Sequence, residues 1–121
     1  MSEKVVADLG NVQKTLFLPL WGRAVETRKP NPLLMDKTAL EIIEKVDFDF
    51  STITRNITEL SQIAWIMRSV CVDGVITSML EKHPKATIVN IGCGLDTTFD
   101  RIDNGHLFWY DLDLPDVIEL R

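Results

Sequence analysis

The amino-acid sequence predicts an α/β protein with a helical N-terminal part followed by the beginning of a strand–helix–strand sheet. Two changes of pattern support this class. Apolar residues recur at three- and four-residue intervals up to about residue 82, which is typical of helices. After Pro84 they form two short runs, 86–91 and 106–113, which glycines and a short helical segment separate, as in a strand–helix–strand unit.

The helical part begins with two short predicted helices. Residues 20–28 form the first, which ends at Lys29-Pro30-Asn31-Pro32 because the residue before a proline disfavours helical backbone. Residues 36–46 form the second, on the helical spacing of Ala39, Leu40, Ile42, Ile43 and Val46.

The longest predicted helix begins near residues 56–58 and ends near Lys82. Asn56 followed by Glu59 resembles a capping box. Lys82 and His83 suit a helix C-terminus, and Pro84 stops the helix. Its apolar residues form a stripe typical of a core-facing helix: Leu60, Ile63, Ala64, Met67, Val70, Cys71, Val75, Met79 and Leu80.

The run at residues 86–91 is β-branched and nearly continuously apolar, as in a strand buried on both faces. Gly92-Cys93-Gly94 ends this strand. The remaining elements follow as a helix over 97–102, a turn at 103–105, a strand over 106–113 and the first turns of a helix over 115–121. The proline at residue 115 suits a first helical turn.

Composition and charge exclude several classes of protein. With 121 residues, 45% of them hydrophobic, the chain is neither disordered nor collagen-like and is long enough for one domain. A net charge of −5 argues against a nucleic-acid clamp and an anionic membrane surface. No secretory signal is evident, and Arg68 and Asp73 interrupt the most apolar stretch, so no membrane span is expected. A cytoplasmic protein is the default expectation.

The cysteines and histidines predict neither a metal site nor a disulfide. Cys71 and Cys93 lie far apart without a CxxC spacing, and His83 and His106 are isolated. The three tryptophans are expected in the core rather than in an aromatic cage: Trp21, Trp65 and Trp109.

The glycines after the first strand and the acid after the second predict a ligand site. Gly92 and Gly94 permit a sharp turn and a close backbone approach to a ligand, which a Cβ would obstruct. Asp113 lies 19 positions after Gly94, near the separation at which an acid reaches ribose hydroxyls. This geometry suits an adenosine.

The same loop disfavours a dinucleotide. Thr97 stands where the GxGxxG pattern has its third glycine, so space for a pyrophosphate is not evident. A sulfonium amino acid in place of the diphosphate removes that requirement, which favours S-adenosylmethionine. A structural βα turn and a fragment of a dinucleotide oxidoreductase are the alternatives.

Residues 89–101, which include Gly92-Cys93-Gly94-Leu95-Asp96-Thr97, resemble the cofactor loop of the leucine carboxyl methyltransferase family, in its polyketide O-methyltransferase (tetracenomycin-type) branch. Arg68 with Asp73 is similar to the family's Arg-to-Asp pair before the first strand. Two further segments agree. Lys14-Thr15-Leu16 followed by Pro19-Leu20 and Gly22-Arg23-Ala24 is similar to the N-terminal signature of the polyketide branch, and Asp111-Leu112-Asp113-Leu114-Pro115 resembles the end of the family's second strand.

The resemblance implies roles for individual residues. Arg68 pairs with the methionyl carboxylate, to which arginine offers a bidentate fork, and Lys14 helps to hold the same group. The alternative for Arg68 is a solvated position on the polar face of its helix. Gly92 and Gly94 line the cofactor and Asp113 binds the ribose, while Asp111 is either cofactor-binding or structural.

Two more expectations concern neighbours of that loop. Asp96 is expected to cap the following helix, because an acid suits a helix N-terminus. Cys93 is expected to pack as a small residue between strand and cofactor, since nothing marks an activated thiolate.

The resemblance also implies an organisation. Residues 1–84 correspond to an N-terminal helical lid or cap, and residues 85–121 to the start of a Rossmann-like class I methyltransferase domain. Family members are about twice as long, so the sheet is expected to be incomplete after its second strand. A small-molecule substrate and either a homo-oligomer or completion by a second chain are expected, without nucleic acid or membrane. The expected function is O-methylation of a polyketide or carboxyl acceptor, with a non-catalytic binding or oligomerisation module as the alternative.

Overall fold

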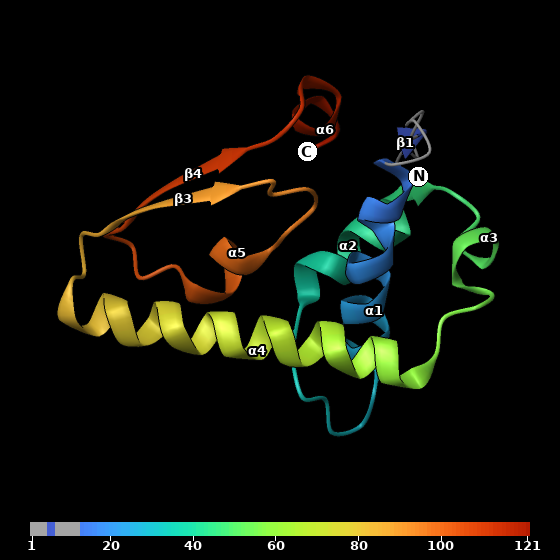
Figure 1. Ribbon diagram of the computed structural model, residues 1–121, viewed down its shortest axis with the longest axis horizontal. Helices are drawn as coiled ribbons and strands as arrows, with labels where there is room; N and C mark the ends of the chain where they lie inside the picture. The colour runs from blue at the N-terminus through green and yellow to red at the C-terminus, as the bar shows by residue number, and fades with distance from the viewer. Residues whose placement is uncertain (1–4, 7–12) are drawn as a thin grey trace.

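The computed structural model describes residues 5–6 and 13–121, with side chains from residue 15 onward (Figure 1). Helices occupy most of the chain up to residue 82, and a parallel strand–helix–strand unit follows, which confirms the α/β class. In chain order the elements are β1 (Val5–Val6), the 3-10 helix η1 (Gln13–Leu16), α1 (Phe17–Thr27), α2 (Lys37–Lys45), β2 (Val46–Asp47), α3 (Ser51–Thr54), α4 (Glu59–Lys82), β3 (Thr87–Ile91), α5 (Thr98–Ile102), β4 (Phe108–Leu112) and α6 (Pro115–Leu120).

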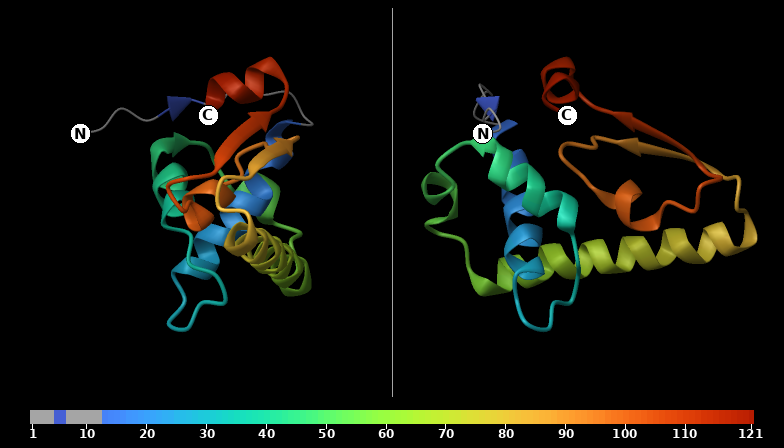
Figure 2. Two further views of the ribbon diagram at one scale, coloured as in Figure 1. Left: turned by 90° about the vertical axis from the view of Figure 1, so that its left-hand side faces the viewer. Right: turned by 180° about the vertical axis from the view of Figure 1, so that it is seen from behind.

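Helix α4 runs along the whole molecule and connects its two ends (Figures 1 and 2). At one end it contacts α1, which packs against α2. At the other end α5 lies between α4 and the sheet, and contacts α4. The approach of α1 to α4 depends on Gly22, where a Cβ would come within 3.0 Å of the Trp65 ring.

The strands form two small parallel sheets. Strand β3 pairs with β4 in a register that runs from Thr87 opposite Phe108 to Ile91 opposite Leu112. Strand β1 pairs with β2 near α2. The strands predicted over 86–91 and 106–113 are thus confirmed. Strand β3 begins one residue later than predicted, and β4 begins two residues later and ends one residue earlier.

A single apolar cluster joins the helical part to the loop after β3. Phe17 is fully buried and contacts Phe48 and Phe50, at ring-centroid distances of 5.0 and 5.7 Å. Leu95, from the loop after β3, belongs to the same cluster. The core therefore fixes the position of that loop relative to α1 and α2.

Helix α4 differs from its prediction in the burial of its apolar residues. Within the predicted stripe only Leu80 is buried, whereas Leu60 is 76% exposed and Val75 is exposed as well. Apolar side chains occur on all sides of this helix, and among the described elements mainly α1 and α5 contact it. By length and composition alone, α4 is also apolar enough to cross a membrane, contrary to expectation, although a core helix of a water-soluble protein meets the same test.

The strand over 87–91 is not buried on both faces. Its side chains alternate between half-buried and exposed, and Ile91 is 81% exposed. One face of the sheet lies over α5, while no described element covers the other. The apolar run therefore indicates a strand without showing what covers it.

Two predicted helix caps are wrong. The side chain of Thr58, not Asn56, caps α4 by accepting a hydrogen bond from the Ser61 N–H, and Glu59 is the first helical residue. Helix α5 follows Thr97 and has no side-chain cap, because the carboxylate of Asp96 bonds elsewhere.

Two smaller predictions also differ from the structure. Helix α1 begins at Phe17, three residues before the predicted start at residue 20. The three tryptophans are half-buried rather than fully in the core.

Candidate functional site

The loop at residues 92–97, here the glycine loop, leaves β3 in a sharp turn that two glycines permit. Gly92 and Gly94 have φ values of +68° and +51°, which L side chains rarely adopt. The N–H groups of Gly92 and Cys93 both donate to the Leu112 carbonyl, at 2.7 and 3.1 Å. The turn therefore begins against the end of β4.

Asp113 holds the next part of the glycine loop. Its Oδ2 accepts the Gly94 N–H at 2.7 Å, and its Oδ1 accepts the Leu114 N–H at 2.7 Å. Residues that the sequence separates by 19 positions thus meet where the two strands end. A carboxylate has about four acceptor sites, so Asp113 keeps acceptor capacity for further hydroxyl groups.

Asp111 bonds within the protein. Its Oδ1 accepts from the Trp109 Nε1–H at 2.9 Å and from Asn90, and its Oδ2 pairs with Arg121 at 2.9 Å. These contacts favour the structural alternative. Arg121 also donates to the carbonyls of Gly94 and Asp96, at 2.8 and 3.0 Å, and so holds the glycine loop from the α6 side.

Asp96 connects the glycine loop to β3 and α5. Its Oδ2 accepts from the Asn90 amide at 2.9 Å, and its Oδ1 accepts from the Thr98 hydroxyl at 2.8 Å. The sequence indicated a capping role, but both oxygens take side-chain donors. Residue preferences at helix ends do not predict the bond between Asp96 and Asn90 on β3.

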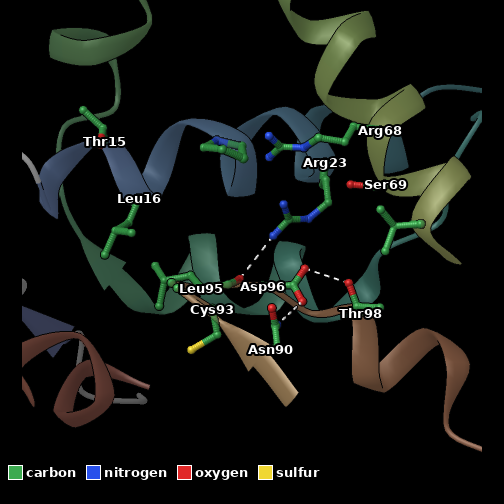
Figure 3. A pocket seen from close by; sticks show the side chains of 14 residues that line it. Thr15, Leu16, Arg23, Arg68, Ser69, Asn90, Cys93, Leu95, Asp96 and Thr98 are labelled. Atoms are coloured by element: carbon green, nitrogen blue, oxygen red, sulfur yellow. Dashed lines mark hydrogen bonds between the residues drawn. The ribbon is translucent and has the colours of Figure 1, made fainter. Parts of the chain in front are cut away.

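A cavity of about 320 Å³ lies between the glycine loop, α1 and α4 (Figure 3). Of the predicted site residues, Arg68, Gly92 and Gly94 line this cavity. Arg68 comes from α4 and is exposed, so its guanidinium is accessible at the cavity. Asp111 and Asp113 do not line it. The side chain of Lys14 lies outside the described part of the chain.

Cys93 lines the same cavity and is buried. Burial raises the pKa of its thiol above the ordinary value. A protonated thiol is a poor nucleophile, so the structure agrees with a packing role. Cys71 is exposed on α4, and both cysteines are free thiols.

Arg23 also lines this cavity, although its sequence position alone indicates no role in the site. It is only 5% exposed, and its Nη2 donates to the Leu95 carbonyl at 3.1 Å (Figure 3). Burial lowers the pKa of its guanidinium, and the neighbouring Asp36 opposes that shift. A signal was available, because Arg23 lies between the apolar residues Leu20 and Ala24 at helical spacing, on the side of α1 that the structure buries.

Asp36 is the centre of a buried cluster, here the Asp36 cluster, consisting of Arg23, Asp36, Asp73, Thr97 and Arg101. Asp36 Oδ2 accepts from Arg23 Nε and Arg101 Nη1, each at 2.9 Å, and from the Thr97 hydroxyl. Arg101 also binds Asp73 on α4 through two hydrogen bonds of 2.6 and 3.0 Å. Asp73 therefore pairs with Arg101 on α5, not with Arg68 of its own helix.

A second cavity, of about 410 Å³, lies on the other side of the glycine loop between α1, α2 and α6. Leu95 and Asp96 border both cavities. The glycine loop therefore separates the two cavities.

Comparison with known proteins gives two informative relatives. The tetracenomycin polyketide synthesis O-methyltransferase TcmP of Streptomyces glaucescens is 37% identical over 114 residues, which cover 93% of this chain and 42% of TcmP. The S-adenosyl-L-methionine-dependent methyltransferase dpfgK of Gibberella zeae is 29% identical over 128 residues, covering 98% of this chain and 43% of that protein. No solved structure matches. The chain therefore spans about two fifths of the length of these relatives.

The family model named leucine carboxyl methyltransferase matches residues 17–121. This match includes every helix and strand from α1 to α6, together with both arginines at the cavity and the whole glycine loop. The chain belongs to the leucine carboxyl methyltransferase family.

Proposed function

We propose that this chain supplies the S-adenosylmethionine site of an O-methyltransferase, with the ligand in the cavity between the glycine loop and Arg68. The hydrogen bond from Gly94 N–H to Asp113 carries the proposal, because it joins the loop after the first strand to the acid after the second. This arrangement is the one in which open α/β sheets bind nucleosides at the carboxyl ends of their strands. We further propose that β3, α5 and β4 begin a Rossmann-like class I methyltransferase sheet.

Each proposed contact follows from the chemistry of the ligand. Arg68 presents a guanidinium to the methionyl carboxylate from across the cavity, and Lys14 precedes a residue that lines it, Thr15. No atom lies within 4 Å of the Cβ position of Gly92, so a ligand is able to approach the backbone there. Asp113 does not line the cavity itself but bonds to Gly94, which does, and its remaining acceptor sites suit the ribose hydroxyls of a ligand that extends past Gly94.

S-adenosylmethionine, when bound, supplies a methyl group on a positively charged sulfur. The protein contributes mainly by holding the reactants in line and excluding water. TcmP carries polyketide synthesis in its name, which favours a small hydroxyl or carboxyl acceptor for this family branch.

A non-catalytic binding module is the second candidate. The observation in its favour is that the residues proposed here hold the cofactor, and none is assigned to the acceptor. Positioning of the acceptor contributes roughly 7 to 11 kcal/mol to such a transfer. We therefore expect the 121-residue chain to bind the cofactor without enzyme-like turnover.

Calorimetric titration with S-adenosylhomocysteine and with NAD tests the proposal. We expect binding of S-adenosylhomocysteine, weakened by Asp113→Asn and by Arg68→Gln. Asp116→Asn is the matched control, since Asp116 is an exposed acid on α6 whose one side-chain bond within the described part of the chain is from the Val117 N–H. Equal or tighter binding of NAD contradicts the proposal. Transfer of radiolabelled methyl groups to phenolic and carboxylate acceptors then separates the enzyme from the binding module.

A further inference from the structure

We propose that Asp36 is a positioning residue for the glycine loop, which it holds through the hydroxyl of Thr97. The inference rests on the proposed function, because it concerns the loop at which the ligand is expected to bind. Neither Asp36 nor Thr97 lines the first cavity, in which the ligand is expected to bind, and Thr97 borders the second cavity on the other side of the loop. Their effect on ligand binding is therefore exerted through the shape of the loop.

The bonds of Asp36 exceed what a helix cap requires. Its Oδ1 accepts the Ala39 N–H at 2.9 Å and so caps α2. Its Oδ2 takes three other donors, from Arg23, Thr97 and Arg101, and Asp36 itself is 1% exposed. A buried carboxylate is tolerated only when it is paired and fully hydrogen-bonded, and two guanidiniums provide the pairing here.

The Asp36 cluster holds the glycine loop at two places. Thr97 donates its hydroxyl directly to Asp36. Two residues earlier, the Leu95 carbonyl accepts from Arg23, whose Nε is bonded to Asp36. The backbone on either side of Asp96 is thus attached to the helical part of the molecule, while Asp113 and Arg121 hold the loop from the opposite side.

Thr97 occupies the position of the third glycine in the GxGxxG pattern. A glycine there would leave the end of the loop without a side chain to anchor it. The hydroxyl gives Asp36 a donor at the residue that immediately precedes α5. The threonine in place of the third glycine therefore attaches the glycine loop to Asp36, which lies 61 positions earlier in the chain.

Thr97→Val tests this role, because it removes the hydroxyl while keeping the shape of the side chain. Thr27→Val is the matched control: Thr27 is also buried, and its hydroxyl accepts from the Asp36 N–H and donates to the Arg23 carbonyl, each at 2.8 Å, but it makes no hydrogen bond to the glycine loop. We expect Thr97→Val to weaken S-adenosylhomocysteine binding about tenfold, and Thr27→Val to lower the melting temperature without changing the affinity of the folded protein.

A double-mutant cycle identifies the pair. Asp36→Asn keeps an oxygen for the α2 cap and removes the charge that Thr97 faces. The Thr97 hydroxyl also accepts from Arg101 Nη1 at 2.7 Å. If Asp36 and Thr97 act together, the double variant Asp36→Asn/Thr97→Val therefore loses less affinity than the sum of the two single losses. Additive losses, or equal losses from Thr97→Val and Thr27→Val, overturn the proposal. Should Asp36→Asn fail to fold, the comparison of the two threonine variants still decides.

Hydrogen exchange separates this proposal from the proposed function. In the ligand-free protein, Thr97→Val is expected to accelerate amide exchange at residues 94–97, whereas Thr27→Val is not. If Thr97→Val accelerates exchange at these amides but the unaltered protein does not bind S-adenosylhomocysteine, the result supports the positioning role of Asp36 and Thr97 and contradicts the proposed ligand. Unchanged exchange at these amides would overturn the positioning role, whichever ligand binds.

Discussion

At the scale of single residues, Gly92 and Gly105 share a backbone requirement but differ in location. Both have positive φ, +68° and +77°, and open space surrounds the Cβ position of each. An alanine in left-handed backbone costs roughly 1–2 kcal/mol. We expect Gly92→Ala and Gly105→Ala to lower the free energy of unfolding by about this amount each, as measured by urea denaturation.

Ligand binding should distinguish these two variants. Gly92 lines the cavity, whereas Gly105 lies in the turn before β4. Titration with S-adenosylhomocysteine is therefore expected to show weaker binding for Gly92→Ala only. If Gly105→Ala weakens binding as much, the effect comes from overall stability and the glycine loop has no special part in binding.

The two cysteines are expected to react at different rates. Cys71 is exposed, while Cys93 is buried and its pKa is raised by burial. At neutral pH Cys93 therefore carries less thiolate, the reactive form, than a thiol of ordinary pKa does. With Ellman's reagent we expect one fast and one slow thiol, and Cys71→Ser should remove the fast one. Because Cys93 lines the cavity, bound S-adenosylhomocysteine should slow the reaction of its thiol further. Equal reaction rates for Cys71 and Cys93 in the ligand-free protein would contradict the burial of Cys93.

At the scale of elements, the N-terminus of α4 provides a test of the observed cap. Thr58 accepts the Ser61 N–H at 3.1 Å, and Asn56 has no such bond to the helix. Replacing a capping threonine by alanine typically costs about 1 kcal/mol. Thermal unfolding should therefore show a lower melting temperature for Thr58→Ala and little change for Asn56→Ala. The reverse order would favour the capping box that the sequence indicates.

Elements with local signals could be predicted from the sequence. Asp36 marks the start of α2, Pro84 follows the end of α4, and Pro115 is the first residue of α6. Each signal acts through backbone geometry or capping within a few residues. The meeting of Gly94 with Asp113 was also predictable, since a strand–helix–strand unit brings the ends of its strands together.

Burial and the Asp36 cluster could not be predicted in this way. Whether Leu60 or Ile91 is covered depends on what packs against α4 and the sheet, and periodicity shows only that a face is apolar. The three donors to the Asp36 Oδ2 lie 13 to 65 positions away along the chain. No local pattern specifies such contacts, so the sequence indicated Asp36 only as the first residue of a helix.

At the scale of the whole molecule, the uncovered sheet face predicts association. Val89 is directly opposite Tyr110, and both are exposed, as are Ile91, Phe108 and Leu112. Exposed apolar patches of this kind mark interaction surfaces. We propose that another copy of the chain covers this face, and we expect light scattering at micromolar concentration to show a dimer or larger species for the chain alone.

A variant of the sheet face tests this expectation. Val89→Lys with Tyr110→Glu places opposite charges across the strands, which keeps the pairing favourable while making the face polar. It should shift the protein towards monomer. Leu33→Lys with Met35→Glu, in the exposed loop between α1 and α2, is the matched control and should not. A stable monomer in the unaltered chain would contradict association through the sheet.

The attachment of the glycine loop to distant residues also bears on the order of folding. Arg101 reaches Asp36 across 65 positions, and Arg121 reaches Gly94 across 27. Contacts between distant residues require closure of a long loop before they add stability, so they form later than local ones. Helix α4, whose backbone bonds are local, therefore forms before the site is complete. During synthesis on the ribosome, the loop lacks its Arg121 contacts until that residue has emerged. In refolding, we expect the recovery of S-adenosylhomocysteine binding to trail the recovery of the helical signal in circular dichroism.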